Sequence, residues 1–178
     1  KDRLLWGGLK NLISGATTVV HHNPWHRILG KKDFPVKVLK NMTWSHSLAF
    51  GKSIQKSFPK KSNIPFVIHA AEGIDEAAFD EIKKLGALGL IKSNTVLIHG
   101  IALNDESINL LVQQQASIVW CPASNDYMFR QTANINDLKM KIRVALGSDS
   151  TLTGSATLLD EMKVAINTGM ATPKEIFQ

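Results

Sequence analysis

Three short apolar segments of this chain each lead into a residue that can bind a metal ion or carry a proton. They end at His69, His99 and Asp149, and Glu72 follows the first of these by three positions. Short apolar runs of this kind are typical of parallel strands that are buried on both faces. Because the carboxyl ends of parallel strands meet at one edge of a sheet, we expect these side chains to line a shared pocket.

Segments with helical spacing alternate with further strand-like runs along the chain. We expect strands at 16–20, at 36–39 continuing into 42–47, and at 65–69, 95–99, 117–120 and 142–148. The residues expected to cap the helices are Asp75, Asn104, Ser155 and Thr172. About six strand–helix units predict an α/β fold with a parallel sheet, within a single domain over residues 1–178.

Charge and composition exclude several classes of function. The net charge is +6, but the lysines are scattered and form no long basic block, so we expect no nucleic-acid partner. The single cysteine, Cys121, rules out an internal disulfide and fits a reducing, cytoplasmic compartment. No run of about 18 apolar residues and no signal-peptide pattern occurs, so we expect no membrane partner.

The residue types at the predicted sheet edge suit a hydrolytic metal centre. Such a centre needs nitrogen or oxygen ligands and a base, and His69, His99 and Asp149 offer the ligand types. Glu72 could move a proton from water to a leaving nitrogen, and Asp149 could instead accept the water proton. Each residue alone could equally be a hydrogen-bonded structural group. A common position at three strand ends favours the shared site.

Two groups of polar and aromatic residues remain ambiguous. Adjacent residues on a strand point to opposite faces, so His21 and His22 cannot both enter one pocket without a bend. We assign them to a loop or rim, with contact of one of them with substrate as the alternative. Trp44 and His46 either line a pocket or are a packed tryptophan beside a hydrogen-bonded histidine.

Further candidates for substrate contacts are Trp25, Trp120, Ser124 and Asn125, of which Trp120 is equally suited to the core. Cys121 is interpreted as a small buried residue, because nothing near it in the sequence would lower its pKa.

Four motifs taken together resemble the strand-end motifs of the amidohydrolase superfamily. They are His-Ala-Ala-Glu at 69–72, Leu-Ile-His-Gly at 97–100, Cys-Pro-Ala-Ser-Asn at 121–125 and Leu-Gly-Ser-Asp-Ser at 146–150. Their order and spacing are similar to the branch that holds cytosine, guanine and S-adenosylhomocysteine deaminases and chlorohydrolase-like enzymes. The adenosine deaminase branch has similar motifs, and the resemblance extends from Gly15 onward.

The resemblance implies a (β/α)₈ TIM barrel that binds one divalent metal ion, zinc first and iron as the alternative. It makes His69 the fifth-strand metal ligand and Glu72 the proton shuttle. His99 would orient the attacking water or polarise the substrate, and Asp149 would bind the metal and act as general base. The implied reaction is hydrolysis of a carbon–nitrogen bond other than a peptide bond. The implied substrate is a small heterocyclic amine of purine, pyrimidine or triazine type, which is deaminated.

The chain departs from the superfamily pattern at one point. The superfamily carries a His-x-His pair at the end of its first strand, upstream of the segment matching Ala16–Val20, and this sequence contains no His-x-His. The resemblance therefore implies a central fragment of an incomplete barrel, which binds metal loosely or not at all and has little activity alone. The open sheet edges of such a fragment favour association into a homo-oligomer.

Two alternatives stay open. The chain could be a non-catalytic barrel remnant that binds a small ligand or a partner, and a His-x-His upstream of Lys1 would argue against that. It could also be a dehalogenating or amide-cleaving relative that uses the same centre on another leaving group.

Overall fold

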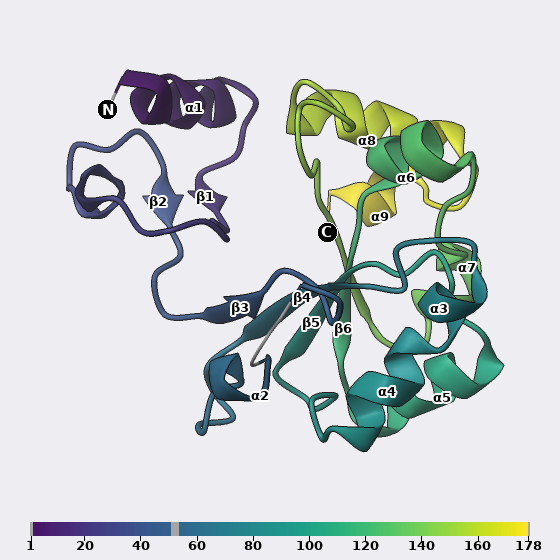
Figure 1. Ribbon diagram of the computed structural model, residues 1–178. Helices are drawn as coiled ribbons and strands as arrows, with labels where there is room; N and C mark the ends of the chain where they lie inside the picture. Colours follow the sequence, from purple (N-terminus) through teal and green to yellow (C-terminus); the bar gives the residue numbers. More distant parts are fainter. Residues whose placement is uncertain (1, 51–53, 178) are drawn as a thin grey trace.

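The computed structural model describes residues 2–50 and 54–177, and its centre is a five-stranded parallel sheet (Figure 1). The strands lie side by side in the order of the sequence: β3 (Thr43–Ser45), β4 (Phe66–Ala70), β5 (Thr95–His99), β6 (Ser117–Trp120) and β7 (Arg143–Leu146). All four strand pairings are parallel, so every strand ends at the same edge of the sheet.

Helices connect successive strands and cover the sheet. The longer ones are α4 (Glu81–Ala87), α5 (Asp105–Gln113), α6 (Pro122–Phe129) and α8 (Leu158–Asn167). The short ones are α2 (Ile54–Ser57), α3 (Glu76–Phe79), α7 (Ile135–Leu138) and α9 (Pro173–Ile176). Figure 1 shows α3, α4 and α5 together on one side of the sheet, and α6 next to α8 beyond the carboxyl ends of the strands.

The main core lies between the sheet and these helices. Its largest fully buried apolar side chains are Phe66, Ile68, Leu97, Ile118 and Trp120 from strands, and Ile82, Leu85, Leu111 and Leu138 from helices. Each such side chain stabilises the fold by roughly 1.5–3 kcal/mol on burial. In β5 the fully buried residues alternate with half-buried ones, so the helices cover one face of this strand more completely than the other.

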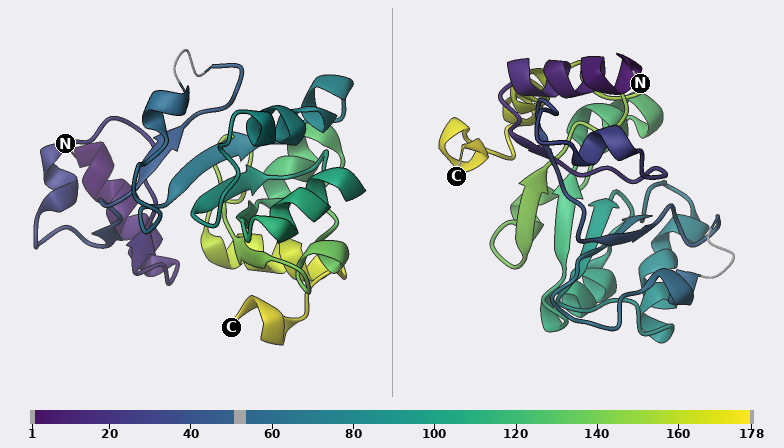
Figure 2. Two further views of the ribbon diagram at one scale, coloured as in Figure 1. Left: turned by 90° about the horizontal axis from the view of Figure 1, so that it is seen from below. Right: turned by 90° about the vertical axis from the view of Figure 1, so that its left-hand side faces the viewer.

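A smaller lobe precedes the sheet. It contains α1 (Asp2–Ile13), the 3₁₀ helix η1 (Arg27–Gly30) and a separate parallel pair, β1 (Thr18–Val19) with β2 (Lys37–Val38). Ile28, Leu29 and Val38 form its own small core. Figures 1 and 2 show this lobe beside the carboxyl edge of the large sheet.

The predicted alternation of strands and helices, and the parallel sheet, are confirmed. Asp75 caps α3, Asn104 caps α5, and Thr172 forms a full capping box with Glu175. The prediction for the last long helix is wrong: Thr157 caps α8, and the backbone N–H of Ser155 donates instead to the carboxylate of Glu161.

The prediction of one strand running from 36–39 into 42–47 is also wrong. This segment forms β2 and β3, which belong to different sheets, because β2 pairs with β1 and β3 pairs with β4. The chain therefore has seven strands among the described residues rather than about six.

In the ranges 2–50 and 54–177, no helix has the length and apolar character needed to cross a membrane.

Candidate active site

The parallel sheet brings three potential metal ligands together at its carboxyl edge. His69 lies near the end of β4, His99 ends β5, and Asp149 follows β7 by three residues. One ligand atom from each lies within 4.8 Å of those of the other two. Two imidazole nitrogens and a carboxylate oxygen at this spacing fit the donor set that zinc takes in proteins.

The backbone at this edge adopts the left-handed conformation at three non-glycine residues. Ala71, His99 and Asp149 have φ angles of 52°, 80° and 51°. Such conformations cost about 1–3 kcal/mol each and cluster at functional sites. Gly100 also has a positive φ, and a Cβ there would collide with the side chain of Ile118, which accounts for glycine directly after His99.

His69 is held by a backbone carbonyl in one defined tautomer. Its Nδ1 lies 2.8 Å from the carbonyl oxygen of His46. Because a carbonyl oxygen only accepts, Nδ1 carries the proton and Nε2 keeps its lone pair. Burial lowers the pKa of His69, which favours the neutral imidazole that metal binding requires.

His99 is the most enclosed member of the group, with 1% of its surface exposed. Its Nδ1 lies 2.8 Å from Oδ1 of Asn125, and its Nε2 lies 3.4 Å from a carboxylate oxygen of Glu72. Burial lowers the pKa of His99 as well. The ring therefore connects a buried amide on one side with Glu72 on the other.

Glu72 stands in an environment that disfavours its charged form. Burial first, and then the negative charge of Asp149, raise its pKa to about 7. A carboxyl group with this pKa can both donate and accept a proton at neutral pH, which is the property of a proton shuttle.

Asp149 stays ionised at the same pH. Burial opposes its charge most strongly, yet the hydrogen bond from Ser124 and the nearby imidazoles His99 and His69 hold its pKa below the usual range. The Ser124 hydroxyl donates to Oδ2 over 2.5 Å, and Thr153 donates to the same oxygen over 3.3 Å. Two neighbouring carboxyl groups thus carry different protonation states, the usual arrangement of an acid and a base.

Two further histidines lie beside the ligand cluster. The ring of His22 meets His69 edge-on at 5.0 Å between centroids, and His46 stacks on His69 at 4.9 Å. His22 lies in a loop, as expected, and its ring nevertheless contacts the ligand cluster. Its position just after β1, another strand end, was the signal that could have identified it. The ring of Trp44 packs against that of His22 at 6.0 Å between centroids, so Trp44 and His46 both lie beside the ligand cluster.

The other candidate contacts differ in exposure, and Trp120 lies in the core, which was one of its two expected positions. Trp120, Ser124 and Asn125 are at most 2% exposed. Ser124 and Asn125 hydrogen-bond to the site residues Asp149 and His99. Trp25 is exposed on the small lobe, with the Lys40 ammonium over its ring. Cys121 is buried, and burial raises the pKa of its thiol, which agrees with its interpretation as a small core residue.

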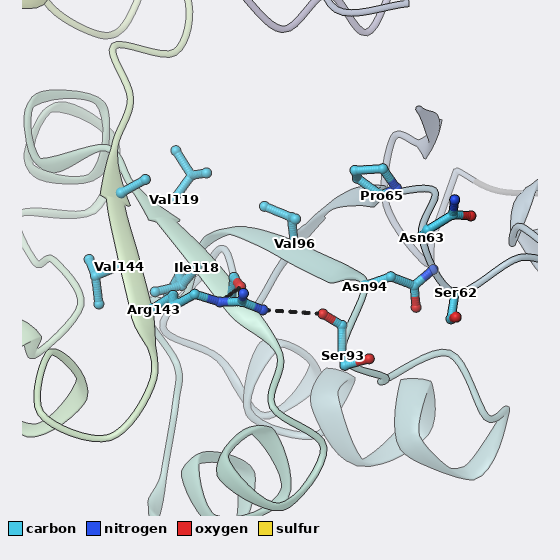
Figure 3. Close-up of a pocket in the computed structure, with 12 residues that line it drawn as sticks. Ser62, Asn63, Pro65, Ser93, Asn94, Val96, Ile118, Val119, Arg143 and Val144 are labelled. Carbon is cyan, nitrogen blue, oxygen red and sulfur yellow. Dashed lines mark hydrogen bonds between the residues drawn. The ribbon is translucent and has the colours of Figure 1, made fainter. Parts of the chain in front are cut away.

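A separate hollow of about 480 Å³ lies at the opposite, amino-terminal edge of the sheet (Figure 3). Figure 3 shows Arg143 reaching across it to the carbonyl of Ser93, which accepts over 3.4 Å. In parallel sheets of this type chemistry gathers at the carboxyl edge, so this hollow is not assigned to the reaction.

Comparison with known proteins gives one family and several relatives. The profile described as "Amidohydrolase family" matches residues 37–178. The 5-methylthioadenosine/S-adenosylhomocysteine deaminase of Pyrococcus furiosus is 30% identical over 114 residues, 58% of this chain and 27% of that protein. Guanine deaminase of Rattus norvegicus is 35% identical over 78 residues, 43% of this chain and 17% of that protein.

Solved structures share the fold at low identity. An adenosine deaminase from Xanthomonas campestris with bound zinc superposes with a TM-score of 0.64 at 18% identity, covering 83% of this chain and 36% of the other. A guanine deaminase from C. acetobutylicum with bound guanine gives 0.61 at 19% identity, covering 95% and 56%. The matches to the two sequence relatives span less than a third of each relative's length.

Proposed function

Because the chain belongs to the amidohydrolase family, we propose that it carries the catalytic edge of a metal-dependent hydrolase that deaminates a small heterocyclic amine. The observation that carries this proposal is the convergence of His69, His99 and Asp149 within 4.8 Å. The names of the relatives, which include guanine, adenosine and S-adenosylhomocysteine deaminases, support the reaction type. In this proposal residues 1–178 are one partial (β/α)₈ barrel domain.

His69, His99 and Asp149 would hold the divalent metal, with zinc as first choice and iron as the alternative. The two imidazoles are kept neutral by burial and Asp149 is kept ionised, so all three groups are in the form that binds a cation. A metal bound there supplies Lewis-acid activation of water.

The remaining steps are assigned to the side chains themselves. Asp149 accepts a proton from the attacking water, since it is the ionised carboxylate of the pair. Glu72 delivers a proton to the leaving nitrogen, since its pKa of about 7 keeps a protonated fraction available at neutral pH. Nε2 of His99 lies 3.4 Å from Glu72, and the two groups would act on the same water or substrate molecule at this edge.

A zinc titration of the 178-residue chain tests the metal assignment. Because the described part of the chain offers only these three ligands, we expect weak binding of one zinc ion per chain by calorimetry, and loss of that binding in His69→Ala. His26→Ala is the matched control, because His26 is an exposed N-cap residue of η1. Unchanged zinc stoichiometry in His69→Ala would contradict ligation by His69. Ammonia release from purines, pyrimidines and triazines then tests the reaction.

The second candidate is a non-catalytic barrel remnant that binds a ligand without turnover. The His-x-His pair that the resemblance places on the first strand discriminates the two candidates: finding it upstream of Lys1 would favour the hydrolase, and its true absence there would favour the remnant. A chain that binds a purine but no zinc would support this candidate over the hydrolase.

A further inference from the structure

A chain of buried hydrogen bonds runs behind His99. Nδ1 of His99 meets Oδ1 of Asn125 at 2.8 Å, and the amide nitrogen of Asn125 donates to the Thr132 hydroxyl over 3.1 Å. The indole N–H of Trp120 donates to the same hydroxyl over 2.6 Å. Asn125 and His99 are each 1% exposed, so water does not compete for these groups.

The orientation of the Asn125 amide decides which nitrogen of His99 carries the proton. Thr132 Oγ1 accepts from Trp120, whose indole can only donate, and uses its second lone pair for the Asn125 amide nitrogen. The amide oxygen is thereby turned towards His99. Because this oxygen only accepts, Nδ1 carries the hydrogen and Nε2 presents a lone pair towards Glu72.

We propose that Asn125, oriented by Thr132 and Trp120, is a positioning residue that holds His99 as the Nδ1–H tautomer and so makes Nε2 the reactive nitrogen. His69 has the same tautomer, but a backbone carbonyl holds it there. For His99 a side chain performs this task, so it can be removed by substitution. The consequence for metal binding rests on the proposed function, whereas the tautomer itself does not.

The competing arrangement is a flipped amide. In that case the Thr132 hydroxyl would donate to the amide oxygen and Asn125 would donate to Nδ1 of His99. His99 would then carry its proton on Nε2, facing Glu72. The two arrangements differ in the protonated nitrogen, which nitrogen chemical shifts report directly.

Long-range ¹H–¹⁵N spectra of the histidine rings in the zinc-free 178-residue chain test the tautomer. The His99 signals are assigned by their loss in His99→Gln. We expect the Nδ1–H pattern for His99. An Nε2–H pattern would overturn the proposal, whatever the protein's activity.

Substitutions then test whether the amide is responsible. Asn125→Asp keeps an acceptor for Nδ1–H and should retain the tautomer. Asn125→Leu removes the acceptor and should give a tautomer mixture and about 10–100-fold weaker zinc binding, the usual effect of losing a partner of a ligating histidine. Thr132→Val frees the amide to rotate and should give an intermediate mixture. Asn136→Leu, at an exposed position of α7, is the control.

The outcomes separate this proposal from the proposed function. Zinc affinity and tautomer unchanged in folded Asn125→Leu would overturn the positioning role and leave the hydrolase intact. If the wild-type protein binds no zinc, the metal centre is refuted. If the same protein shows the Nδ1–H tautomer of His99, and this tautomer is lost in Asn125→Leu and kept in Asn125→Asp, the role of Asn125 is supported. If Asn125→Leu does not fold, the Thr132→Val spectrum decides: an unchanged tautomer overturns the proposal.

Discussion

Glu72 and Asp149 show how one edge of a sheet can give two carboxyl groups opposite tasks. Burial and the charge of Asp149 raise the pKa of Glu72 to about 7. Hydroxyl donors and imidazoles lower the pKa of Asp149. The difference between the two pKa values comes from the neighbouring groups. Asp149 accepts hydrogen bonds from Ser124 and Thr153, whereas Glu72 faces the Nε2 of His99.

Replacing Glu72 by glutamine tests proton transfer by this side chain while keeping its size and shape. The glutamine side chain would keep a polar group near His99 but could not exchange a proton, so we expect turnover by the complete enzyme to fall by about 10²–10⁴-fold. Zinc content should stay at the wild-type level, because the metal assignment does not include Glu72. Ammonia release measured beside elemental analysis checks both parts. Turnover close to wild type would remove Glu72 from the mechanism.

At the scale of elements, two helix glutamates each connect two backbone segments at the carboxyl edge. Glu161 of α8 accepts from the backbone N–H of Ala123, over 2.9 Å, and of Ser155, over 3.2 Å. Glu81 of α4 accepts from the N–H of Ala71, over 2.8 Å, and of Leu48, over 3.4 Å. Glu161 therefore ties the first turn of α6 to the loop before α8, and Glu81 ties two loops that adjoin site residues.

Glu161→Gln should destabilise the fold by about 1–3 kcal/mol. A glutamine amide has one oxygen, so one of the two backbone N–H groups loses its acceptor next to a side chain that is fully buried. Urea unfolding followed by circular dichroism measures the change. Glu106→Gln, at an exposed position of α5, should change stability little. Equal stability of Glu161→Gln and wild type would show that the paired hydrogen bonds of Glu161 contribute nothing.

Glu81 makes the stability of the fold depend on pH, and the direction of its pKa shift fixes the sign of that dependence. Burial raises its pKa above the ordinary value of 4.5, against the opposing effect of the N–H donors of Ala71 and Leu48. The folded state then binds the proton more tightly than the unfolded chain. The stabilisation is complete below pH 4.5 and is lost as pH rises through the folded-state pKa.

The comparison with Glu81→Gln isolates this contribution. We expect the free energy of unfolding of wild type, relative to the variant, to decline as pH rises above 4.5. Urea titrations at several pH values provide the curves. A difference that grows with pH would mean that the pKa of Glu81 is lowered by folding.

At the scale of the whole molecule, the sheet has two free edges. Among the described residues β3 pairs only with β4, and β7 pairs only with β6. Unpaired strand edges promote association with other chains. We expect the average mass of the 178-residue chain in light scattering to rise with concentration. A monomer of constant mass over a wide concentration range would contradict this.

The local sequence pattern was sufficient to predict most strands, most helix caps and the types of metal ligand in the site. The strand endings at His69 and His99, and the Asn104 cap, depend on residues only a few positions apart, so the sequence by itself determined them. Parallel pairing then explains why the three ligand side chains converge. The break of the 36–47 segment into two strands could not be predicted, because it depends on which neighbour each half pairs with.

Only the tertiary structure decided which other side chains contact these ligand residues and the loops around them. Asn125 meets His99 from 26 positions away, and Glu161 reaches Ala123 across 38 positions. His22 joins the site because the small lobe lies against the carboxyl edge of the sheet. Contacts over such separations depend on how strands and helices pack in space. The periodicity of a single segment carries no information about that packing.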